Sequence, residues 1–280
     1  MRHAERQYWH EVATEWAQAP QQTWRTHSDA VNAHLLSGWL PRTRLRRVLK
    51  TDAFDEAVSA GLFPQLAARA ETVIAIDISS ATLAAAARKY ADLAVVTADL
   101  RRLPFANGSL DAIASLSSLD HFQTLEELTT SLRELRRVLA PGGHLILTLD
   151  NLKNPLVALR NALPFSLMHG LGIVPYRVGR TVGPRHLQAL LKEVGLEVHE
   201  IGAVLHVPRV FAVALANLVD RLGSDAIRRR FLACLLAFER LAQLPTRFLT
   251  GYFVAVRARR PASDSPHQLS APRLVEIHGH

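Results

Sequence analysis

Residues 47–77, RVLKTDAFDEAVSAGLFPQLAARAETVIAID, contain a short apolar run, a polar turn, a helical pattern and a second apolar run that ends on an acidic residue. This order is typical of an α/β domain, in which ligands bind at the carboxyl ends of the parallel strands. The turn after the first run, KTDAFDE at 50–56, contains no glycine. Glycine lets a backbone approach a ligand closely, so this turn decides how a ligand could be held.

The alternation of apolar runs and helical patterns continues along most of the chain. We expect strands at 46–49, 72–76, 94–97, 112–116 and 144–149, and helices at 55–70, 80–90 and 125–139, the last closed by a Pro-Gly-Gly turn at 141–143. Further on we expect a helix at 183–194, a strand from 195, apolar helices at 208–222 and 224–243, and a strand at 252–257. The sequence therefore predicts an α/β fold: a Rossmann-like, doubly wound, mostly parallel seven-stranded sheet with helices on both faces.

The remaining segments are predicted to surround this sheet. Residues 1–41 hold all four tryptophans and form an N-terminal helical cap, whose tryptophans could line a pocket or pack the cap onto the sheet edge. Residues 42–260 form the Rossmann-like domain, with a helical lid inserted at 151–182 and a helical insertion at 208–243. The polar tail at 261–280, rich in Pro, Ser and His, is expected to be disordered.

The net charge of +8 is compatible with nucleic acid, an anionic membrane or anionic substrates. The arginine runs contain no interleaved aromatic residues of the kind that stack on bases, so we expect no nucleic-acid partner. Solvated helix and strand flanks are the favoured interpretation of these runs.

The N-terminal segment is amphipathic and charged, without the apolar centre of a signal peptide, and no stretch approaches the ~18 apolar residues of a spanning helix. We therefore expect a cytoplasmic protein, with a peripheral membrane contact left open. The single cysteine, Cys234, lies in an apolar run and is expected to be a buried thiol.

Two acidic residues follow neighbouring strands of the predicted sheet. Asp77 ends the second strand, where a carboxylate can accept hydrogen bonds from both hydroxyls of a ribose or can simply cap the next helix. Asp99 follows the third strand, where it could accept from an adenine amine while Leu100 borders the base. Parallel strands bring both carboxylates to one edge of the sheet.

The motifs DIS at 77–79, TADLRRLPFANGSLDAI at 97–113, HF at 121–122 and ELRRVLAPGGHLILTLDN at 134–151 occur in a specific order and spacing. Together they resemble the class I S-adenosylmethionine-dependent methyltransferases, in particular those with a methyltransferase type 11 core. The resemblance is strong over residues 44–150 and looser over 183–257.

This resemblance implies S-adenosyl-L-methionine as cofactor, S-adenosyl-L-homocysteine as product, and no metal. It implies that Asp77, beside Ile78, binds the ribose and that Asp99 and Leu100 bind the adenine. Ser117 and Leu119, in the segment after the fourth strand, would lie beside the methionine part and the methyl group.

The chain departs from the family at the first turn, where the family has an acidic residue followed by Gly-x-Gly-x-Gly. One interpretation is a variant site, in which Thr51 or Asp52 contacts the amino or carboxylate group of the cofactor and Lys50 neutralises a charge. Asp52 could also cap the next helix, with Asp55 in a capping-box-like position. The other interpretation is that cofactor binding has been lost.

The resulting hypothesis is a bacterial methyltransferase that acts on a small-molecule acceptor of glycan, lipid or secondary-metabolite type, as a monomer or homodimer. His121 is the candidate general base, although it could equally begin the next helix. Further candidates for the acceptor pocket are His27, His34, His169 and Tyr176, with Arg177, Arg180 and Arg185 for an anionic group. The alternative is a non-catalytic or non-methylating protein with a methyltransferase fold.

Overall fold

The computed structural model describes residues 7–12, 21–170, 174 and 177–263. Within them the chain forms a seven-stranded sheet in the order β3-β2-β1-β4-β5-β7-β6. Strands β1 to β5 are parallel, and β7 runs antiparallel to both β5 and β6. The strands are β1 (Leu45–Lys50), β2 (Ala70–Asp77), β3 (Leu93–Thr97), β4 (Leu110–Leu116), β5 (Leu139–Asp150), β6 (Glu197–Val204) and β7 (Phe253–Arg259). The predicted Rossmann-like, seven-stranded sheet is confirmed.

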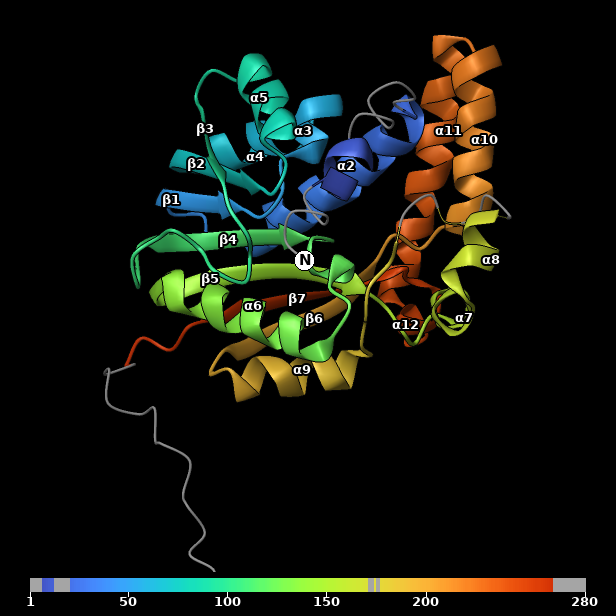
Figure 1. Cartoon of the computed structure of the whole chain (residues 1–280). Helices are drawn as coiled ribbons and strands as arrows, with labels where there is room; N and C mark the ends of the chain where they lie inside the picture. Colours follow the sequence, from blue (N-terminus) through green and yellow to red (C-terminus); the bar gives the residue numbers. More distant parts are fainter. Residues whose placement is uncertain (1–6, 13–20, 171–173, 175–176, 264–280) are drawn as a thin grey trace, which may run out of the picture.

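Helices cover both faces of this sheet (Figure 1). On one face, α6 (Leu125–Val138) and α9 (Pro184–Glu193) pack in a core that includes Leu49 of β1. On the other, α2 (Gln22–Trp39), α4 (Phe63–Ala67) and α5 (Ser80–Lys89) pack in a core that includes Val48. Consecutive β1 residues thus enter opposite cores, as the pleat of a strand requires, which explains why the apolar runs show no alternation.

Helix α6 illustrates how local sequence sets an element. Thr124 and Glu127 form a complete capping box at its start, and the apolar residues Leu128, Leu132 and Leu135 recur on its buried face. The helix ends at Val138, but the expected turn at 141–143 is not a separate turn. The Pro-Gly-Gly triplet instead lies inside β5, where the register against β4 shifts and Gly142 has a φ of 76°. That prediction was wrong, because a bulge can absorb the positive φ within a strand.

A second correction concerns the predicted helix at 55–70. The structure has two short helices here, α3 (Phe54–Val58) and α4 (Phe63–Ala67). They are separated at Gly61, which has a φ of 62°, a conformation outside the right-handed helical region. A β-carbon at this glycine would lie 2.7 Å from Glu56 Oε1, so only glycine fits.

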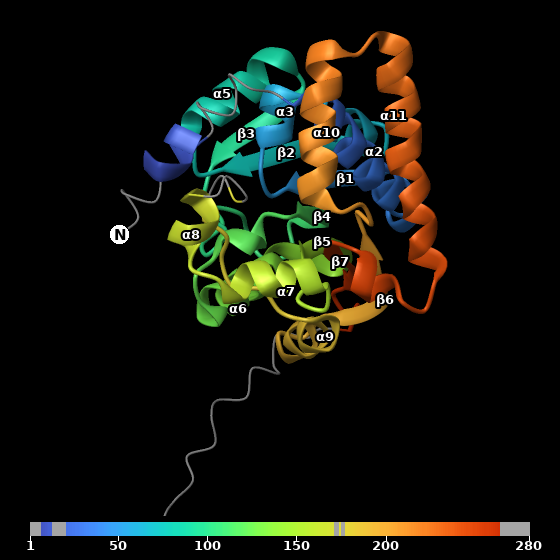
Figure 2. The same ribbon diagram turned by 90° about the vertical axis from the view of Figure 1, so that its right-hand side faces the viewer.

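The segments inserted around the sheet form a helical side wall (Figure 2). It contains α7 (Pro155–Ala162), α8 (Phe165–Gly170), α10 (Arg209–Leu222), α11 (Asp225–Ala237), the 3-10 helix η2 (Phe238–Gln243) and α12 (Arg247–Thr250). Helices α10 and α11 pack against α2 in a third core, with Trp24 and Val31 facing Ala212, Ala216 and Leu235. Cys234 on α11 is exposed, contrary to the expected burial, because Leu235 faces α2 instead.

Two expectations fall partly outside the described residues: the cap includes 1–6 and 13–20, and the tail from 264 onward is not described. Among the described helices, none combines the length and apolar character that crossing a bilayer requires.

Candidate functional site

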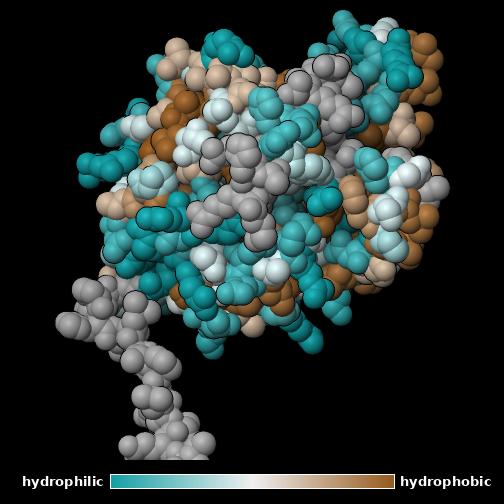
Figure 3. Space-filling view, viewed as in Figure 1, coloured by the Kyte–Doolittle hydropathy of each residue, from teal (hydrophilic) through white to brown (hydrophobic). Residues whose placement is uncertain are grey.

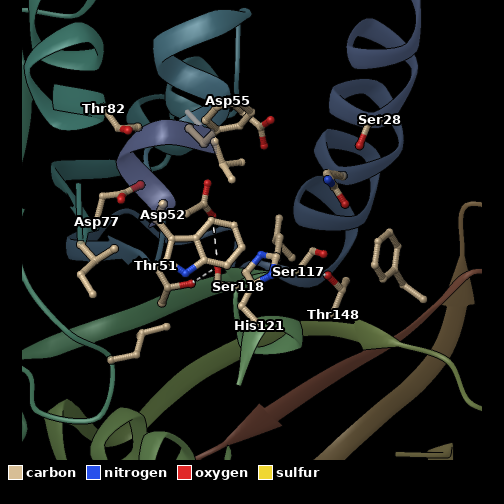
Figure 4. A pocket seen from close by; sticks show the side chains of 18 of the residues that line it. Ser28, Thr51, Asp52, Asp55, Asp77, Thr82, Ser117, Ser118, His121 and Thr148 are labelled. Atoms are coloured by element: carbon tan, nitrogen blue, oxygen red, sulfur yellow. Dashed lines mark hydrogen bonds between the residues drawn. The ribbon is translucent and has the colours of Figure 1, made fainter. Parts of the chain in front are cut away.

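A cavity of about 270 Å³ lies at the carboxyl ends of β1 to β4, with residues of α2 and Arg209 at the start of α10 on its other side. Figure 4 shows the strand ends and α2 around it. Residues from the ends of the strands form its sheet side: Thr51, Asp52, Asp77, Ile78, Asp99, Leu100, Leu116, Ser117, Ser118 and His121. Of the residues predicted for the cofactor site and the general base, all except Lys50 and Leu119 therefore line one cavity. Their proposed roles in binding stay predictions.

Lys50 lies beneath the cavity and not on its wall. The side chain is buried, with Nζ 2.8 Å from Asp52 Oδ1 and 2.9 Å from Glu56 Oε2. Burial opposes the charge, but the nearby carboxylates of Asp52 and Glu56 outweigh it and raise the pKa of Lys50. The ammonium group is therefore held within the turn, where it neutralises the carboxylates of Asp52 and Glu56.

The carboxylate of Glu56 holds the turn after β1 in place. Its Oε1 atom accepts hydrogen bonds from the backbone N–H groups of Leu62 (2.8 Å) and Phe63 (3.1 Å), at the start of α4. Its Oε2 atom pairs with Lys50. Glu56 thus links the end of β1 to the start of α4 under the cavity.

Asp52 does not cap helix α3, which corrects the capping-box prediction. The helix begins at Phe54 after Ala53, and no side chain caps it. Asp52 instead accepts hydrogen bonds from Lys50 Nζ at 2.8 Å and from Ser118 Oγ at 3.1 Å. The ion pair with Lys50 draws Asp52 toward β1 and fixes its carboxylate at the cavity wall.

Three hydroxyl groups join this carboxylate to the end of β4. Thr51 Oγ1 lies 3.0 Å from Ser115 Oγ and 2.7 Å from Ser118 Oγ, and Ser118 in turn donates to Asp52 (Figure 4). The floor of the cavity below the β1 turn is therefore made of hydroxyl and carboxylate side chains. A glycine-rich turn would present backbone N–H groups there.

Ser117 lies at a strained point of the cavity wall. Its φ of 57° is in the left-handed region, which non-glycine residues rarely adopt. Its N–H donates to Thr148 Oγ1 at 2.9 Å, and its hydroxyl donates to Asp120 Oδ2 at 2.7 Å. These bonds hold the backbone in a conformation that turns the chain across the cavity.

Asp77 and Asp99 differ in their surroundings. Asp77 accepts hydrogen bonds from Ser79 N at 2.8 Å and Ala53 N at 3.3 Å, and burial, with the charge of Asp52, raises its pKa to about 6. Asp99 forms an ion pair with Arg101 at 2.8 Å. Asp77 keeps acceptor positions beyond its two contacts, because an ionised carboxylate has about four lone-pair sites, whereas both oxygens of Asp99 accept hydrogen bonds from Arg101.

His121 ends the 3-10 turn η1 (Leu119–His121) and lines the cavity. Burial lowers its pKa to about 4, so its imidazole is neutral at pH 7 and has one nitrogen able to accept a hydrogen bond. Its ring centroid lies 4.3 Å from that of Trp9. Leu119, in the same turn, is fully buried in the core under the sheet and does not reach the cavity.

The wall opposite the sheet contains residues that the sequence did not identify. Arg25 on α2 lies 4.7 Å from the ring centroid of Phe54 and 3.4 Å from Asp55. Arg209, at the start of α10, comes from an insertion whose packing no local pattern predicts, while Phe253 lines the cavity from the start of the predicted strand β7. Trp9 and Trp24 line the cavity, but Trp24 also packs in the third core, as Trp39 packs against the core around Val48; Trp16 falls outside the described residues.

The other histidine and arginine candidates lie elsewhere. His27 is buried behind the cavity wall, His34 and His169 are exposed, and Tyr176 falls outside the described residues. Arg180 lines a second cavity, of about 450 Å³, beneath α7 and α8, while Arg177 and Arg185 line neither cavity. Within the part of the chain that the structure describes, no three His, Cys, Asp or Glu side chains gather as metal ligands would.

A family model for a methyltransferase domain matches residues 55–147, which run from α3 to β5. A demethylmenaquinone methyltransferase from Beutenbergia cavernae is 38% identical over 74 residues. The match covers 26% of this chain and 30% of that enzyme, so the chain spans about a third of the length of this relative.

Solved structures share the fold over most of the chain. A putative sarcosine dimethylglycine methyltransferase from Galdieria sulphuraria has a TM-score of 0.57 and 14% identity, covering 84% of this chain and 86% of that one. The [4+2]-cyclase SpnF has a TM-score of 0.54 and 20% identity, covering 82% and 80%. At these identities the likeness concerns the fold alone. Residues 55–147 of this chain therefore match a methyltransferase domain model, and the described residues have the class I S-adenosylmethionine-dependent methyltransferase fold.

Proposed function

We propose that the cavity binds S-adenosyl-L-methionine and that the protein transfers its methyl group to a small, largely apolar acceptor. The observation that carries the proposal is the division of the cavity into two walls. Carboxylates and hydroxyls from the ends of β1 to β4 form one wall, and aromatic rings with two arginines form the other. The first wall fits a nucleoside with an amino acid attached to it, and the second fits a ring or chain with a polar group.

The residues of the first wall match the chemistry of the cofactor. Asp77 would accept hydrogen bonds from the ribose hydroxyls, and Asp99 with Leu100 would border the adenine. Asp52, held by Lys50 and Ser118, would accept from the ammonium group of the methionine part. In this arrangement side chains bind the methionine part, in place of glycine N–H groups. The carboxylate of Asp52 is already fixed in position before the cofactor binds.

When bound, the cofactor supplies a methyl group made electrophilic by the sulfonium centre. The protein's contribution is to hold the acceptor in line with that methyl and to exclude water. Trp9, Trp24 and Phe54 provide apolar surface for this purpose. His121 would accept a hydrogen bond from an acceptor hydroxyl. With a pKa of about 4 it is a weak base, which suits an acceptor that loses its proton only as the new bond forms.

Apolar lining residues and the arginines Arg25 and Arg209 favour an acceptor with an apolar body and an electron-rich oxygen. A relative named demethylmenaquinone methyltransferase supports a small-molecule acceptor. The proposal for this chain stops at that class.

Calorimetric titration with S-adenosyl-L-methionine and S-adenosyl-L-homocysteine tests the proposal. Both should bind, and Asp77→Ala should weaken binding at least ~10-fold, the loss expected for a charged hydrogen-bond acceptor. Asp92→Ala, an exposed carboxylate in the loop before β3, is the matched control and should bind as the wild type does. A folded wild-type protein that gives no heat at millimolar ligand would contradict the proposal.

The second candidate is a protein that binds the cofactor without transferring its methyl group. The glycine-free turn favours it, since the methionine part would be held differently from the way a glycine-rich turn holds it. SpnF, which shares this fold, is named a [4+2]-cyclase and not a methyltransferase. Cofactor binding together with no methylated product across apolar hydroxyl acceptors would support this candidate over methyl transfer.

A further inference from the structure

Helix α10 exposes its apolar face to solvent. The residues Val210, Phe211, Leu215, Leu218 and Leu222 recur at helical spacing and are 50% to 77% exposed. The opposite face packs on α2 through the small residues Ala212 and Ala216. A solvated helix normally buries its large apolar side chains and exposes its small or polar ones, so α10 is oriented for contact with something apolar.

Helices α7 and α8 extend this surface. They expose Leu156, Leu159, Phe165 and Leu167, each between 37% and 58%. Figure 2 shows α7, α8 and α10 on the same side of the molecule, and Figure 3 shows hydrophobic side chains gathered at that edge. The side chains of α7, α8 and α10 named here are called the apolar face below. Contiguous exposed apolar surface of this kind marks a contact site.

The charge around the apolar face indicates its partner. Residues 151–180, which include α7 and α8, contain four Lys or Arg and no Asp or Glu, and one of the four, Arg160, is paired with Asp150. On α10 the one acidic residue, Asp220, is turned inward and accepts a hydrogen bond from Thr23 N on α2 at 3.2 Å. Two exposed arginines, Arg229 and Arg230, extend the positive charge onto α11.

We propose that the apolar face docks the protein on the surface of an anionic lipid bilayer. Helix α10 would lie in the interface, with its large apolar side chains among the upper acyl chains and the arginines at the phosphate level. Each Lys or Arg near an anionic surface adds to the attraction. Pairing with a second copy of this chain would bring two positive surfaces together, so the charge favours lipid over a dimer.

The apolar face adjoins the candidate active site. Arg209, the first residue of α10, lines the cavity together with Leu205 and Phe253. Docking through α10 would therefore place the cavity beside the bilayer, where an apolar acceptor is concentrated. This last consequence rests on the proposed methyl transfer, whereas the docking itself does not.

Co-sedimentation of the full chain with vesicles tests the docking without any activity measurement. The probes are vesicles of phosphatidylcholine alone and of phosphatidylcholine with phosphatidylglycerol. The partition coefficient should be about tenfold higher for the anionic vesicles and should fall as salt is added. Equal binding to both vesicle types, or binding to neither, would overturn the proposal.

Two pairs of variants locate the contact. Phe211→Ser with Leu215→Ser should lower the partition coefficient at least ~10-fold, while Leu125→Ser at the start of α6 should leave it unchanged. Arg229→Glu with Arg230→Glu should also lower the partition coefficient. The control, Arg46→Glu with Arg88→Glu, makes the same change in net charge outside the helical side wall and should lower the partition coefficient less. Circular dichroism checks that each variant folds.

Sedimentation velocity without lipid provides the competing outcome. If the wild type is a dimer that Phe211→Ser with Leu215→Ser converts to monomer, and vesicle binding is absent, the apolar face is an interface between copies and the membrane proposal fails. A wild-type monomer whose vesicle binding depends on Phe211 and Leu215 supports it.

Discussion

Asp77 places a carboxylate at the end of β2, and burial raises its pKa to about 6. Hydroxyl donors of a ribose need the ionised form of this group, which exists above that pKa. Protonation as the pH falls through 6 should therefore weaken cofactor binding. Asp77 should be about 90% ionised at pH 7 and about 90% protonated at pH 5.

The prediction is that affinity for S-adenosyl-L-homocysteine falls about tenfold between pH 7 and pH 5. Asp77→Asn should bind more weakly at pH 7 and show little dependence on pH, because its amide does not titrate. Calorimetry at both pH values measures this, with Asp92→Asn expected to keep the wild-type dependence. A pH dependence that survives in Asp77→Asn would assign the titration to another group.

At this scale the sequence predicted the positions better than the contacts. Asp77 and Asp99 could be placed because an acidic residue directly after a buried strand lies at the ligand edge of a parallel sheet. The burial of Lys50 could not be predicted, because it depends on Glu56 reaching back under the turn. Arg209 could not be found at all, because its position follows from how a distant insertion packs.

Among the elements, the two helices after β1 depend most on a single side chain. Glu56 is fully buried, pairs with Lys50 and accepts from the two backbone N–H groups that begin α4. The periodic pattern at 55–70 predicted one helix because it recorded apolar spacing alone. Apolar spacing does not reveal that a carboxylate accepts hydrogen bonds from the N–H groups at the start of a second helix.

Glu56→Ala should lower the free energy of unfolding by about 3–5 kcal/mol, because it leaves a buried charge and two buried N–H groups poorly satisfied. Urea denaturation followed by circular dichroism measures the change. Glu126→Ala, on the exposed side of α6, is the control and should cost less than about 0.5 kcal/mol. A loss below about 1 kcal/mol for Glu56→Ala would mean that the turn keeps its structure without this carboxylate.

For the whole molecule, the attachment of the helical side wall to the cap should depend on pH. His27 on α2 is fully buried, its ring centroid lies 5.4 Å from that of Trp24, and it lies against the backbone of Leu235 on α11. Burial lowers its pKa to about 4. The stabilising contribution of the neutral ring is complete above the unfolded pKa of 6.5 and is lost as the pH falls from 6.5 toward 4.

His27→Leu should remove this dependence. Between pH 7.5 and pH 5 the wild type should lose about 2 kcal/mol of unfolding free energy more than the variant does, from a pKa difference of about 2.5 units. Urea titrations at the two pH values provide the comparison. His34→Leu, two turns along the same helix and exposed, should titrate like the wild type. Equal acid sensitivity of His27→Leu and wild type would place the proton uptake elsewhere.

The pairing of β6 with β7 has a consequence for how such proteins can diverge. The two strands are antiparallel neighbours, and Val204 pairs with Phe253, so the chain leaves and re-enters the sheet at the same point. The segment between these two strands contains α10 and α11 and places Arg209 at the cavity. A segment of another length, or a tight turn, could join the same two strand ends without changing the register of any strand. The part of the cavity that would choose an acceptor thus comes from one segment inserted between two paired strands, and the strand ends that would hold the cofactor come from another.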